Sequence, residues 1–311
     1  MLEPGLLVSG AQGVEQRIEV AVEDLIEVVG LKTDPVVGDA VLREVVRADA
    51  FAAVHRADLA GTDRGRLSLL DSPGDEFFAQ YHDVVTARSQ RIPLQHLIGS
   101  AAFGPVVLKV GPGVFVPRPE TEAMLEWAIG QRLAPQPVIV DLCTGSGALA
   151  IALAQHFRAA RILGVDDSDA ALRYARRNAA GSRVELIRAD VTQPDLLAEL
   201  DGGVDLVIAN PPYVPDDAVL EAEVAQHDPP HAVFGGPDGM TVIPAVVGLA
   251  GRLLRPGGLF AVEHDDSTSA ATIECVTGTG LFDDVVARKD LTGRPRFVTA
   301  RRLSDEEDWR Q

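Results

Sequence analysis

The residues best suited to chemistry follow an apolar run, where Val204–Ala209 leads directly into Asn210, Pro211, Pro212 and Tyr213. The two prolines fix φ and remove two backbone donors, so this segment presents carbonyl oxygens and an asparagine side-chain oxygen without competing N–H groups. Such a rigid set of acceptors suits a planar NH2 group, and the tyrosine ring can stack on an amide or base plane. A strand-terminating turn would explain one proline but not the whole segment. We therefore predict that these four residues bind a substrate nitrogen, with Asn210, Pro211 and Tyr213 acting in catalysis.

A second group of residues forms a glycine-containing turn after the apolar run Val138–Leu142. Gly145 and Gly147 let the backbone approach a ligand without a Cβ clash. Asp166 ends the next apolar strand, where a carboxylate can accept hydrogen bonds from both hydroxyls of a ribose. This pairing indicates an adenosine-containing cofactor. It does not identify the cofactor, because Gly145–Ala150 also fits the G-x-G-x-x-A form of the NAD fingerprint, so an NAD-dependent oxidoreductase is an alternative.

Charge favours S-adenosylmethionine (SAM) over a dinucleotide. Asp141 stands just before the turn, where a dinucleotide would place its pyrophosphate, whereas SAM has no phosphate and carries a sulfonium and an ammonium. Asp190, at the end of the third strand, is placed to meet the adenine, although a helix N-cap explains this aspartate equally well. Cys143 has no neighbouring base in the sequence, so we interpret it as a packing residue of the turn. The residues predicted to form the cofactor site are Asp141, Cys143, Thr144, Gly145, Ser146, Gly147, Asp166, Asp190, Val191 and Asn210.

The elements that position these residues alternate between strands and helices from about Glu120 onward. This alternation predicts an α/β fold, with a doubly wound, mostly parallel sheet covered on both faces and closed by an antiparallel hairpin at its edge. Before it, residues 1–90 contain apolar residues at spacings of three and four, which predicts a small helical domain. Residues 91–119 contain β-rich pieces punctuated by glycine, which predicts a β-hairpin linker. Residues 120–311 then form the cofactor-binding domain.

The composition limits the possible partners. The 46 acidic residues exceed the 28 basic residues, and the net charge of −18 disfavours nucleic acid and favours a partner with a basic surface. Two cysteines are too few for a disulfide framework, and no apolar run is long enough for a membrane span, so we expect a cytoplasmic protein without membrane contact. His227 and His231 have a spacing that suits a metal on one helix, but Pro229 and Pro230 break that helix, so we expect no metal site.

Several motifs together carry a family resemblance. N-P-P-Y after a fourth strand is similar to the signature of amino methyltransferases that act on adenine, guanine or glutamine amide nitrogens. The motifs that narrow this group are R-I-P-L-Q-H-L-I-G from Arg91, F-V-P-R-P-E-T-E from Phe115, F-G-G-P-D-G from Phe234, L-R-P-G-G-L-F-A-V-E from Leu254 and D-L-T-G-R-P-R from Asp290. With these, the chain resembles the HemK/PrmC family of protein-(glutamine-N5) methyltransferases, which modify the Gly-Gly-Gln glutamine of class 1 peptide-chain release factors.

The resemblance implies a class I SAM-dependent methyltransferase domain with a seven-stranded sheet, S-adenosylhomocysteine as product, and an N-terminal helical domain that docks the release factor. We also expect the segment from Phe115 to Glu122 to pack beside the substrate pocket, with Phe115 and Arg118 binding the substrate and Arg118 paired to Glu120 or Glu122. A purely structural ion pair explains this segment nearly as well. Val191 stands where relatives often have an aromatic residue against the adenine.

Two alternatives remain. An amino methyltransferase acting on adenine or guanine in DNA or RNA shares N-P-P-Y but is disfavoured by the acidic charge. A non-catalytic module that binds release factors would need a broken SAM site, whereas the glycines and Asp166 are intact.

Overall fold

The computed structural model describes residue 83, residues 86–88 and residues 90–304 of the 311-residue chain. The chain divides into two compact units, Met1–Ile98 and Gly99–Gln311. The described part of the first unit contains the short helix α4 (Leu94–Ile98). Almost all of the helical domain predicted for residues 1–90 lies outside the described residues, so its boundaries and its docking role remain predictions.

The second unit is built on a seven-stranded sheet with the strand order β5-β4-β3-β6-β7-β9-β8. All neighbouring pairs are parallel except those of β9, which runs antiparallel to β7 and β8. The doubly wound sheet with an antiparallel edge is therefore confirmed. The strands are β3 (Val138–Leu142), β4 (Arg161–Asp166), β5 (Val184–Arg188), β6 (Val204–Ala209), β7 (Leu254–Glu263), β8 (Phe282–Lys289) and β9 (Pro295–Arg302).

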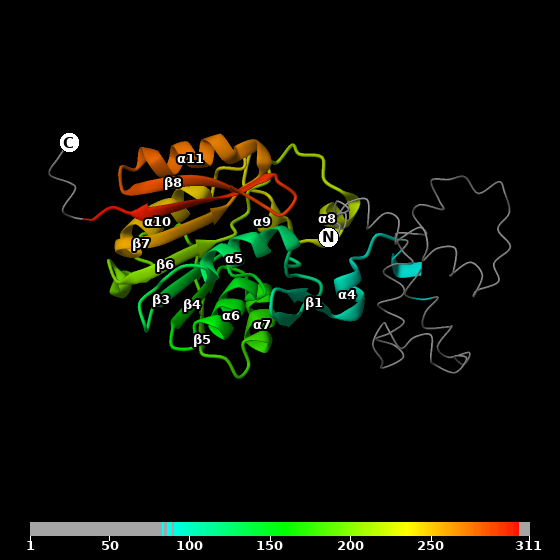
Figure 1. The fold of residues 1–311 in the computed structure, drawn as a ribbon. Coiled ribbons are helices and arrows are strands. Elements are labelled where there is room, and N and C mark those ends of the chain that lie inside the picture. Colours follow the sequence, from blue (N-terminus) through cyan, green and yellow to red (C-terminus); the bar gives the residue numbers. More distant parts are fainter. Residues whose placement is uncertain (1–82, 84–85, 89, 305–311) are drawn as a thin grey trace, which may run out of the picture. The chain divides into compact units, whose positions relative to one another are not determined.

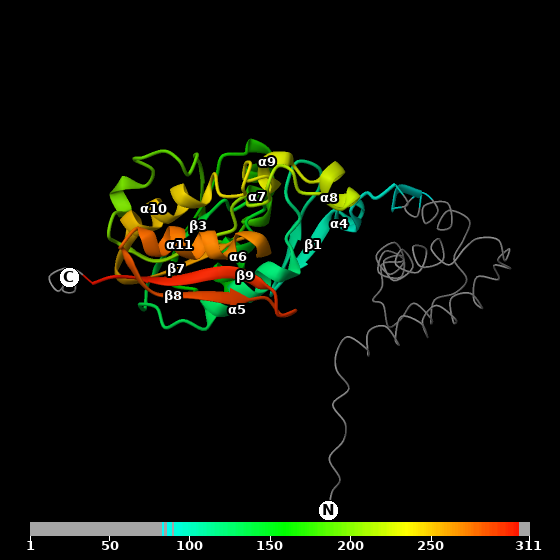
Figure 2. The ribbon, with the colours of Figure 1, turned by 90° about the horizontal axis from the view of Figure 1, so that it is seen from above.

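Helices cover both faces of this sheet because its central strands are apolar at successive positions, which point to opposite faces. In β3, for example, Ile139 belongs to the core under α5 and α6, whereas Val140 belongs to the core under α10 and α11. Figures 1 and 2 show α10 and α11 side by side on one face. The main helices are α5 (Glu122–Ile129), α6 (Ala148–His156), α7 (Asp169–Asn178), α10 (Ile243–Leu253) and α11 (Ser269–Gly278). No described helix is long and apolar enough to cross a bilayer.

Short helical elements connect the larger helices and strands. The chain after β6 forms two short helices that are separated by prolines, and 3-10 turns precede α5 and α11. A third 3-10 turn lies between β5 and β6. These elements are α8 (Ala222–His227), α9 (Pro230–Val233), η2 (Pro119–Thr121), η3 (Ala198–Leu200) and η4 (Asp266–Thr268).

An antiparallel hairpin precedes the sheet and consists of β1 (Ser100–Phe103) and β2 (Val106–Lys109). Its alternate residues are buried in the same core as α5 and α6. The side chain of Asn178, at the end of α7, accepts a hydrogen bond from the Lys109 backbone N–H at 2.7 Å and donates one to the Lys109 carbonyl at 3.0 Å. These two bonds fasten the hairpin to the end of α7, and the hairpin belongs to the second compact unit.

The order of the strands in the sheet determines where the site lies. From β3 the chain winds outward through β4 to β5, then returns to β6 on the other side of β3 and continues to β7. The loops after β3 and β6 therefore leave in opposite directions, which opens a crevice at their carboxyl ends. The glycine turn follows β3, and Asn210 follows β6, so the two motifs meet at this crevice.

Candidate active site

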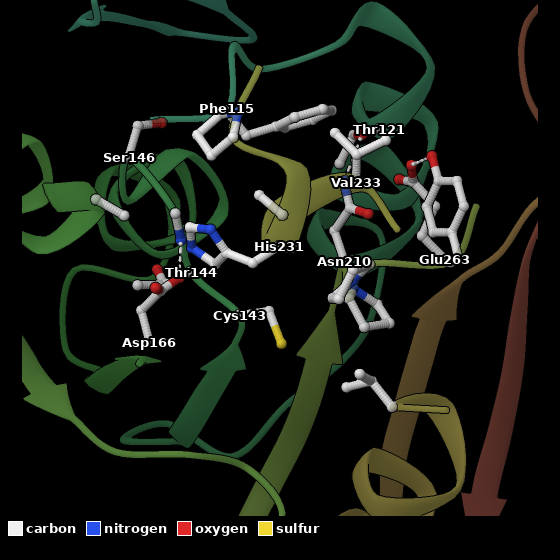
Figure 3. Close-up of a pocket in the computed structure, with 18 of the residues that line it drawn as sticks. Phe115, Thr121, Cys143, Thr144, Ser146, Asp166, Asn210, His231, Val233 and Glu263 are labelled. Carbon is white, nitrogen blue, oxygen red and sulfur yellow. Dashed lines mark hydrogen bonds between the residues drawn. The ribbon is translucent and has the colours of Figure 1, made fainter. Parts of the chain in front are cut away.

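A cavity of about 530 Å³ opens at the carboxyl edge of the sheet and is lined by residues of the second unit. Every predicted site residue lines it except Gly147. Figure 3 shows Thr144 and Asp166 on one side, Asn210, Thr121 and Glu263 on the other, and Phe115 between them. One cavity thus joins the predicted cofactor residues to the predicted substrate residues.

The glycine turn reverses the chain tightly between β3 and α6. Cys143, Gly145 and Gly147 all have positive φ values, of 59°, 57° and 86°. Gly147 takes the N-cap position of α6 rather than a place in the cavity wall, and a Cβ there would lie 2.9 Å from Ile151 Cδ1. Burial and nearby carboxylates raise the pKa of the Cys143 thiol well above its usual range, so this cysteine stays protonated and is a poor nucleophile.

Asp141 is a buried carboxylate with one unused oxygen. Its Oδ2 accepts hydrogen bonds from Thr144 Oγ1 at 2.6 Å and from the Ala150 backbone N–H at 3.1 Å. Its Oδ1 has no hydrogen-bond partner among the described residues, and the side chain lines the cavity. Burial raises the pKa of Asp141 to about 7. A cationic group in the cavity would both pair with Oδ1 and favour the ionised form, which fits the ammonium of SAM.

Asp166 is held rigidly at the end of β4. Its Oδ2 accepts the Gly145 backbone N–H at 2.8 Å and its Oδ1 accepts the Ser168 backbone N–H at 2.9 Å. Burial raises the pKa of this carboxyl, and the two backbone donors and His231 oppose that shift. Each oxygen keeps a lone pair for a further donor, so the oriented carboxylate fits the two hydroxyls of a ribose.

Asp190 and Val191 follow β5 and line the same cavity. Asp190 Oδ1 accepts hydrogen bonds from the Thr192 backbone N–H at 2.8 Å and from Thr192 Oγ1 at 2.7 Å, and these bonds lower its pKa. No α-helix starts here, and the next helical element, η3, begins at Ala198, so the N-cap interpretation of Asp190 is wrong. The aspartate closes its own turn instead, while Val191 is buried in the core under α10 and α11.

Val214, the residue after N-P-P-Y, forms backbone hydrogen bonds with Val233 and with Gly235 of the F-G-G-P-D-G motif. Val214 N–H donates to the Val233 carbonyl at 3.0 Å, and Gly235 N–H donates to the Val214 carbonyl at 2.8 Å. A Cβ on Gly235 would lie 2.6 Å from the Pro212 carbonyl oxygen, and one on Gly239 would collide with the Tyr213 carbonyl. The glycines of this motif therefore make room for the acceptor segment to pack as a rigid backbone.

Two side chains of the segment are anchored on the protein side. Asn210 Nδ2 donates to Thr121 Oγ1 at 3.2 Å, which uses the amide nitrogen and leaves Oδ1 available (Figure 3). The Tyr213 hydroxyl donates to Glu263 Oε1 at 2.9 Å, and burial beside that carboxylate raises the pKa of Tyr213 well above its usual range. The tyrosine therefore contributes a fixed hydroxyl as well as a ring face.

Arg118 forms an ion pair with Asp228 rather than with Glu120 or Glu122, so the predicted pairing is wrong. Helix α8 ends before α9 begins, and the Asp228 side chain between them points inward. This side chain is 1% exposed and pairs with the Arg118 guanidinium. The Arg118 guanidinium also lies 4.9 Å from the centroid of the Phe115 ring. Arg118 thus connects the segment before α5 to the loop after N-P-P-Y, and both border the cavity.

The break between α8 and α9 also separates the two histidines that a single helix would have aligned. His227 ends α8, and His231 lies in α9 on the cavity wall (Figure 3). In the part of the chain that the structure describes, no group of three or more His, Cys, Asp or Glu side chains is arranged to hold a metal ion.

Comparisons with known proteins agree with this geometry. Residues 122–227 match the family model described as the methyltransferase small domain. The chain is 73% identical over 251 residues to the release factor glutamine methyltransferase of Mycobacterium tuberculosis, covering 79% of this chain and 82% of the relative. The chain belongs to the release factor glutamine methyltransferase family. The catalytic domain is therefore that of a SAM-dependent methyltransferase, and the NAD-dependent oxidoreductase alternative is wrong.

Two further relatives mark the range of this similarity. A 4-amino-L-phenylalanine/4-methylamino-L-phenylalanine methyltransferase of Streptomyces pristinaespiralis is 37% identical over 264 residues, covering 82% of this chain and 88% of the relative. The crystal structure of a methyltransferase from Pyrococcus furiosus superposes with a TM-score of 0.50 at 19% identity, covering 70% of this chain and all of that one. This last likeness concerns the fold alone.

Sequence reasoning missed several residues of this methyltransferase site. The cavity is also lined by Thr121, His231, Glu263, Asp265 and Arg296. Glu263 carried a readable signal, because it is a single carboxylate at the carboxyl end of the apolar strand β7, where a parallel sheet places ligands. Thr121 stands within the P-R-P-E-T-E motif, but no local pattern indicates that its hydroxyl reaches Asn210.

Proposed function

We propose that this protein transfers the methyl group of SAM to the side-chain nitrogen, N5, of the Gly-Gly-Gln glutamine of class 1 peptide-chain release factors. The observation that carries the proposal is the acceptor array of Asn210 and Pro211, which faces the same cavity as Asp141 and Asp166. The family membership supports the release factor as substrate, because the relative from Mycobacterium tuberculosis carries that name.

The acceptor array addresses the weakness of the nucleophile. An amide nitrogen is a poor nucleophile because its lone pair is delocalised into the carbonyl. Asn210 Oδ1 and the Pro211 carbonyl would each accept one N–H of the glutamine amide, which increases electron density on the nitrogen and fixes its direction. Holding two reactants in this way can lower a barrier by on the order of 7 kcal/mol. The ring of Tyr213 would flank the amide plane, with Phe115 on the segment before α5.

The other half of the cavity would hold the cofactor. Asp141 Oδ1 is free for an ammonium, and the oxygens of Asp166 are oriented for ribose hydroxyls. Bound SAM supplies an electrophilic methyl group on a sulfonium. Transfer of that methyl group would leave S-adenosylhomocysteine, a neutral thioether, and the glutamine nitrogen would release one proton to solvent. Because positive charge disappears from sulfur, a largely apolar pocket does not oppose the reaction.

Charge and domain structure support a protein partner. The net charge of −18 would steer a partner with a basic surface, and it opposes the binding of DNA or RNA as substrate. We assign release-factor docking to residues 1–90, a role that rests on the family resemblance. The reaction would take place in the cytoplasm, where translation ends.

A second candidate substrate is a free arylamine. The array recognises an NH2 group rather than a whole residue, and the relative from Streptomyces pristinaespiralis is named for acting on 4-amino-L-phenylalanine. The higher identity to the release factor methyltransferase, 73% against 37%, favours the glutamine amide.

Mass spectrometry tests the assignment. A purified class 1 release factor incubated with this protein and SAM should gain one methyl group, on the glutamine of its Gly-Gly-Gln peptide. A release factor whose Gly-Gly-Gln glutamine is replaced serves as control and should gain none. Methylation of 4-amino-L-phenylalanine or of nucleic acid, with the intact release factor left unmodified, would refute the proposal.

A further inference from the structure

Glu263 is a buried carboxylate that the proposed reaction does not use. It ends β7, is 1% exposed and lines the cavity opposite the cofactor residues (Figure 3). Its Oε1 accepts a hydrogen bond from the Tyr213 hydroxyl at 2.9 Å. Its Oε2 is buried without a hydrogen-bond partner among the described residues, and the neighbouring Thr121 hydroxyl lowers the pKa of this carboxyl. An ionised carboxylate at this depth is costly unless donors surround it, so we expect the Thr121 hydroxyl to turn its proton toward the unpaired Oε2.

The same threonine touches the proposed catalytic asparagine. Thr121 Oγ1 accepts a hydrogen bond from Asn210 Nδ2 at 3.2 Å. A hydroxyl has one proton, and ionised Glu263 can only accept, so the Thr121 proton points to Glu263 and the Thr121 lone pair points to Asn210. The nitrogen of the Asn210 amide must then face Thr121, and its oxygen must face away from it. The oxygen and the nitrogen of an asparagine amide have nearly the same size, so the surrounding hydrogen bonds determine which way the amide is oriented.

We propose that Glu263 and Thr121 are positioning residues that hold the Asn210 amide with Oδ1 directed at the substrate nitrogen. The inference rests on the proposed function, in which that oxygen accepts an amide proton. Glu263 also fixes Tyr213 through its hydroxyl, so one carboxylate orients two residues of the N-P-P-Y segment. Neither Glu263 nor Thr121 touches the substrate in this scheme.

Protonation of Glu263 would loosen this arrangement. Burial raises the pKa of Glu263 to about 7; the two hydroxyls and the Arg296 guanidinium oppose the shift, and Glu120 adds to it. A protonated Glu263 can donate to Thr121, which frees the threonine proton for Asn210 Oδ1 and favours the flipped amide. The active orientation is therefore present above this pKa and is lost as the pH falls below it.

Variants of Thr121 test the hydrogen-bond chain. Thr121→Val keeps the shape and removes the hydroxyl, so kcat for the release factor should fall by roughly tenfold, the effect of about one hydrogen bond, with the Kd for SAM unchanged. Thr121→Ser restores the hydroxyl and should recover most of kcat. Thr272→Val removes a buried hydroxyl from α11 that bonds to Thr268 and serves as the matched control, with normal kcat expected. Wild-type kcat in Thr121→Val would overturn the proposal.

A pH profile of Glu263→Gln tests the charge. At saturating SAM, kcat/KM of the wild type should rise with pH through about 7, whereas Glu263→Gln should be slow and should lose that rise. Asp141 is present in both proteins, so the difference between the two profiles belongs to Glu263. Thermal unfolding should show that Glu263→Gln is folded. Identical profiles would contradict the inference, whereas a wild type that leaves the release factor unmethylated would contradict the proposed function instead.

Discussion

Asn210 has two polar side-chain atoms, and one of them forms a hydrogen bond within the protein. The amide nitrogen is bonded to Thr121, and the oxygen is left at the cavity beside the Pro211 carbonyl. Two acceptors next to each other, with no proline N–H to compete, match the two protons of a primary amide. At this scale the protein supplies direction and not a charged base.

Replacement of Asn210 separates catalysis from cofactor binding. Asn210→Ala should keep most of its SAM affinity while turnover of the release factor falls by roughly 100-fold, because a positioned contact to the reacting group is lost. Asn210→Asp retains an acceptor but adds a charge that favours the cationic ground state over the transition state, so it should also be slow. Single-turnover transfer of labelled methyl measures both variants. A near wild-type rate in Asn210→Ala would mean that the amide is held elsewhere.

Asp141 makes cofactor binding depend on pH. Its pKa is raised to about 7 by burial, and a cation binds best to the ionised carboxylate. SAM affinity should therefore increase as the pH rises toward 7, by at most roughly tenfold per pH unit, and should level off above it. Calorimetry measures the Kd for SAM from pH 5.5 to 8.5, because this range extends about one and a half pH units to either side of the pKa. Asp141→Asn should bind SAM weakly and without the pH dependence, and an unchanged profile would show that another group titrates.

At the scale of elements, the loop after β6 is shaped by the glycines that it packs against. Gly235 lies against the Pro212 carbonyl with no room for a Cβ, while Gly248 in α10 has nothing within 4 Å of that position. The N-P-P-Y backbone and the F-G-G-P-D-G motif are therefore one structural unit, although separate stretches of sequence encode them.

These two glycines form a matched pair of variants. Gly235→Ala should push the acceptor segment out of place, lowering turnover strongly and destabilising the fold by about 1–3 kcal/mol. Gly248 lies at an exposed position of α10, so Gly248→Ala should leave turnover unchanged and should stabilise the fold by up to about 1 kcal/mol. Thermal unfolding and methyl transfer are measured on both variants. The comparison separates the steric effect at Gly235 from the effect of replacing any glycine by alanine. Normal turnover in Gly235→Ala would show that the segment can shift without loss of function.

At the scale of the whole molecule, every described residue that lines the cavity belongs to the compact unit Gly99–Gln311. The unit also carries its own hydrophobic core on both sheet faces. Cofactor binding should therefore be independent of the N-terminal part of the chain, whereas recognition of a large protein substrate requires more surface than one cavity offers.

Deletion of residues 1–88 tests this division. The shortened protein should bind SAM with nearly the wild-type Kd but should methylate an intact release factor far more slowly, with the loss mainly in kcat/KM. A short peptide containing Gly-Gly-Gln is the control substrate, and the deletion should affect its methylation little, because the peptide contacts only the cavity. Undiminished activity on the intact factor would show that residues 1–88 are not a docking domain.

Much of the site could be predicted because it depends on local pattern. An apolar strand followed by Asp141 and the glycine turn, or by Asn210 and two prolines, places those residues at the carboxyl edge of any parallel sheet. The order of such strands along the chain then predicts the doubly wound fold. These features are encoded within a few neighbouring residues, so they can be read without knowing what packs against them.

The contacts that orient the site were decided only by the tertiary structure. Asn210 is hydrogen-bonded to Thr121, 89 positions away in the sequence, and Tyr213 to Glu263, 50 positions away. Arg118 pairs with Asp228, 110 positions away, and not with the glutamates near it in the sequence. No periodicity encodes such pairs, because they depend on how separate loops pack over the sheet edge. Burial likewise raises the pKa values of Asp141 and Glu263, and burial is a property of the folded chain: the sequence determined which groups are present, and the packing determined which of them are oriented and charged.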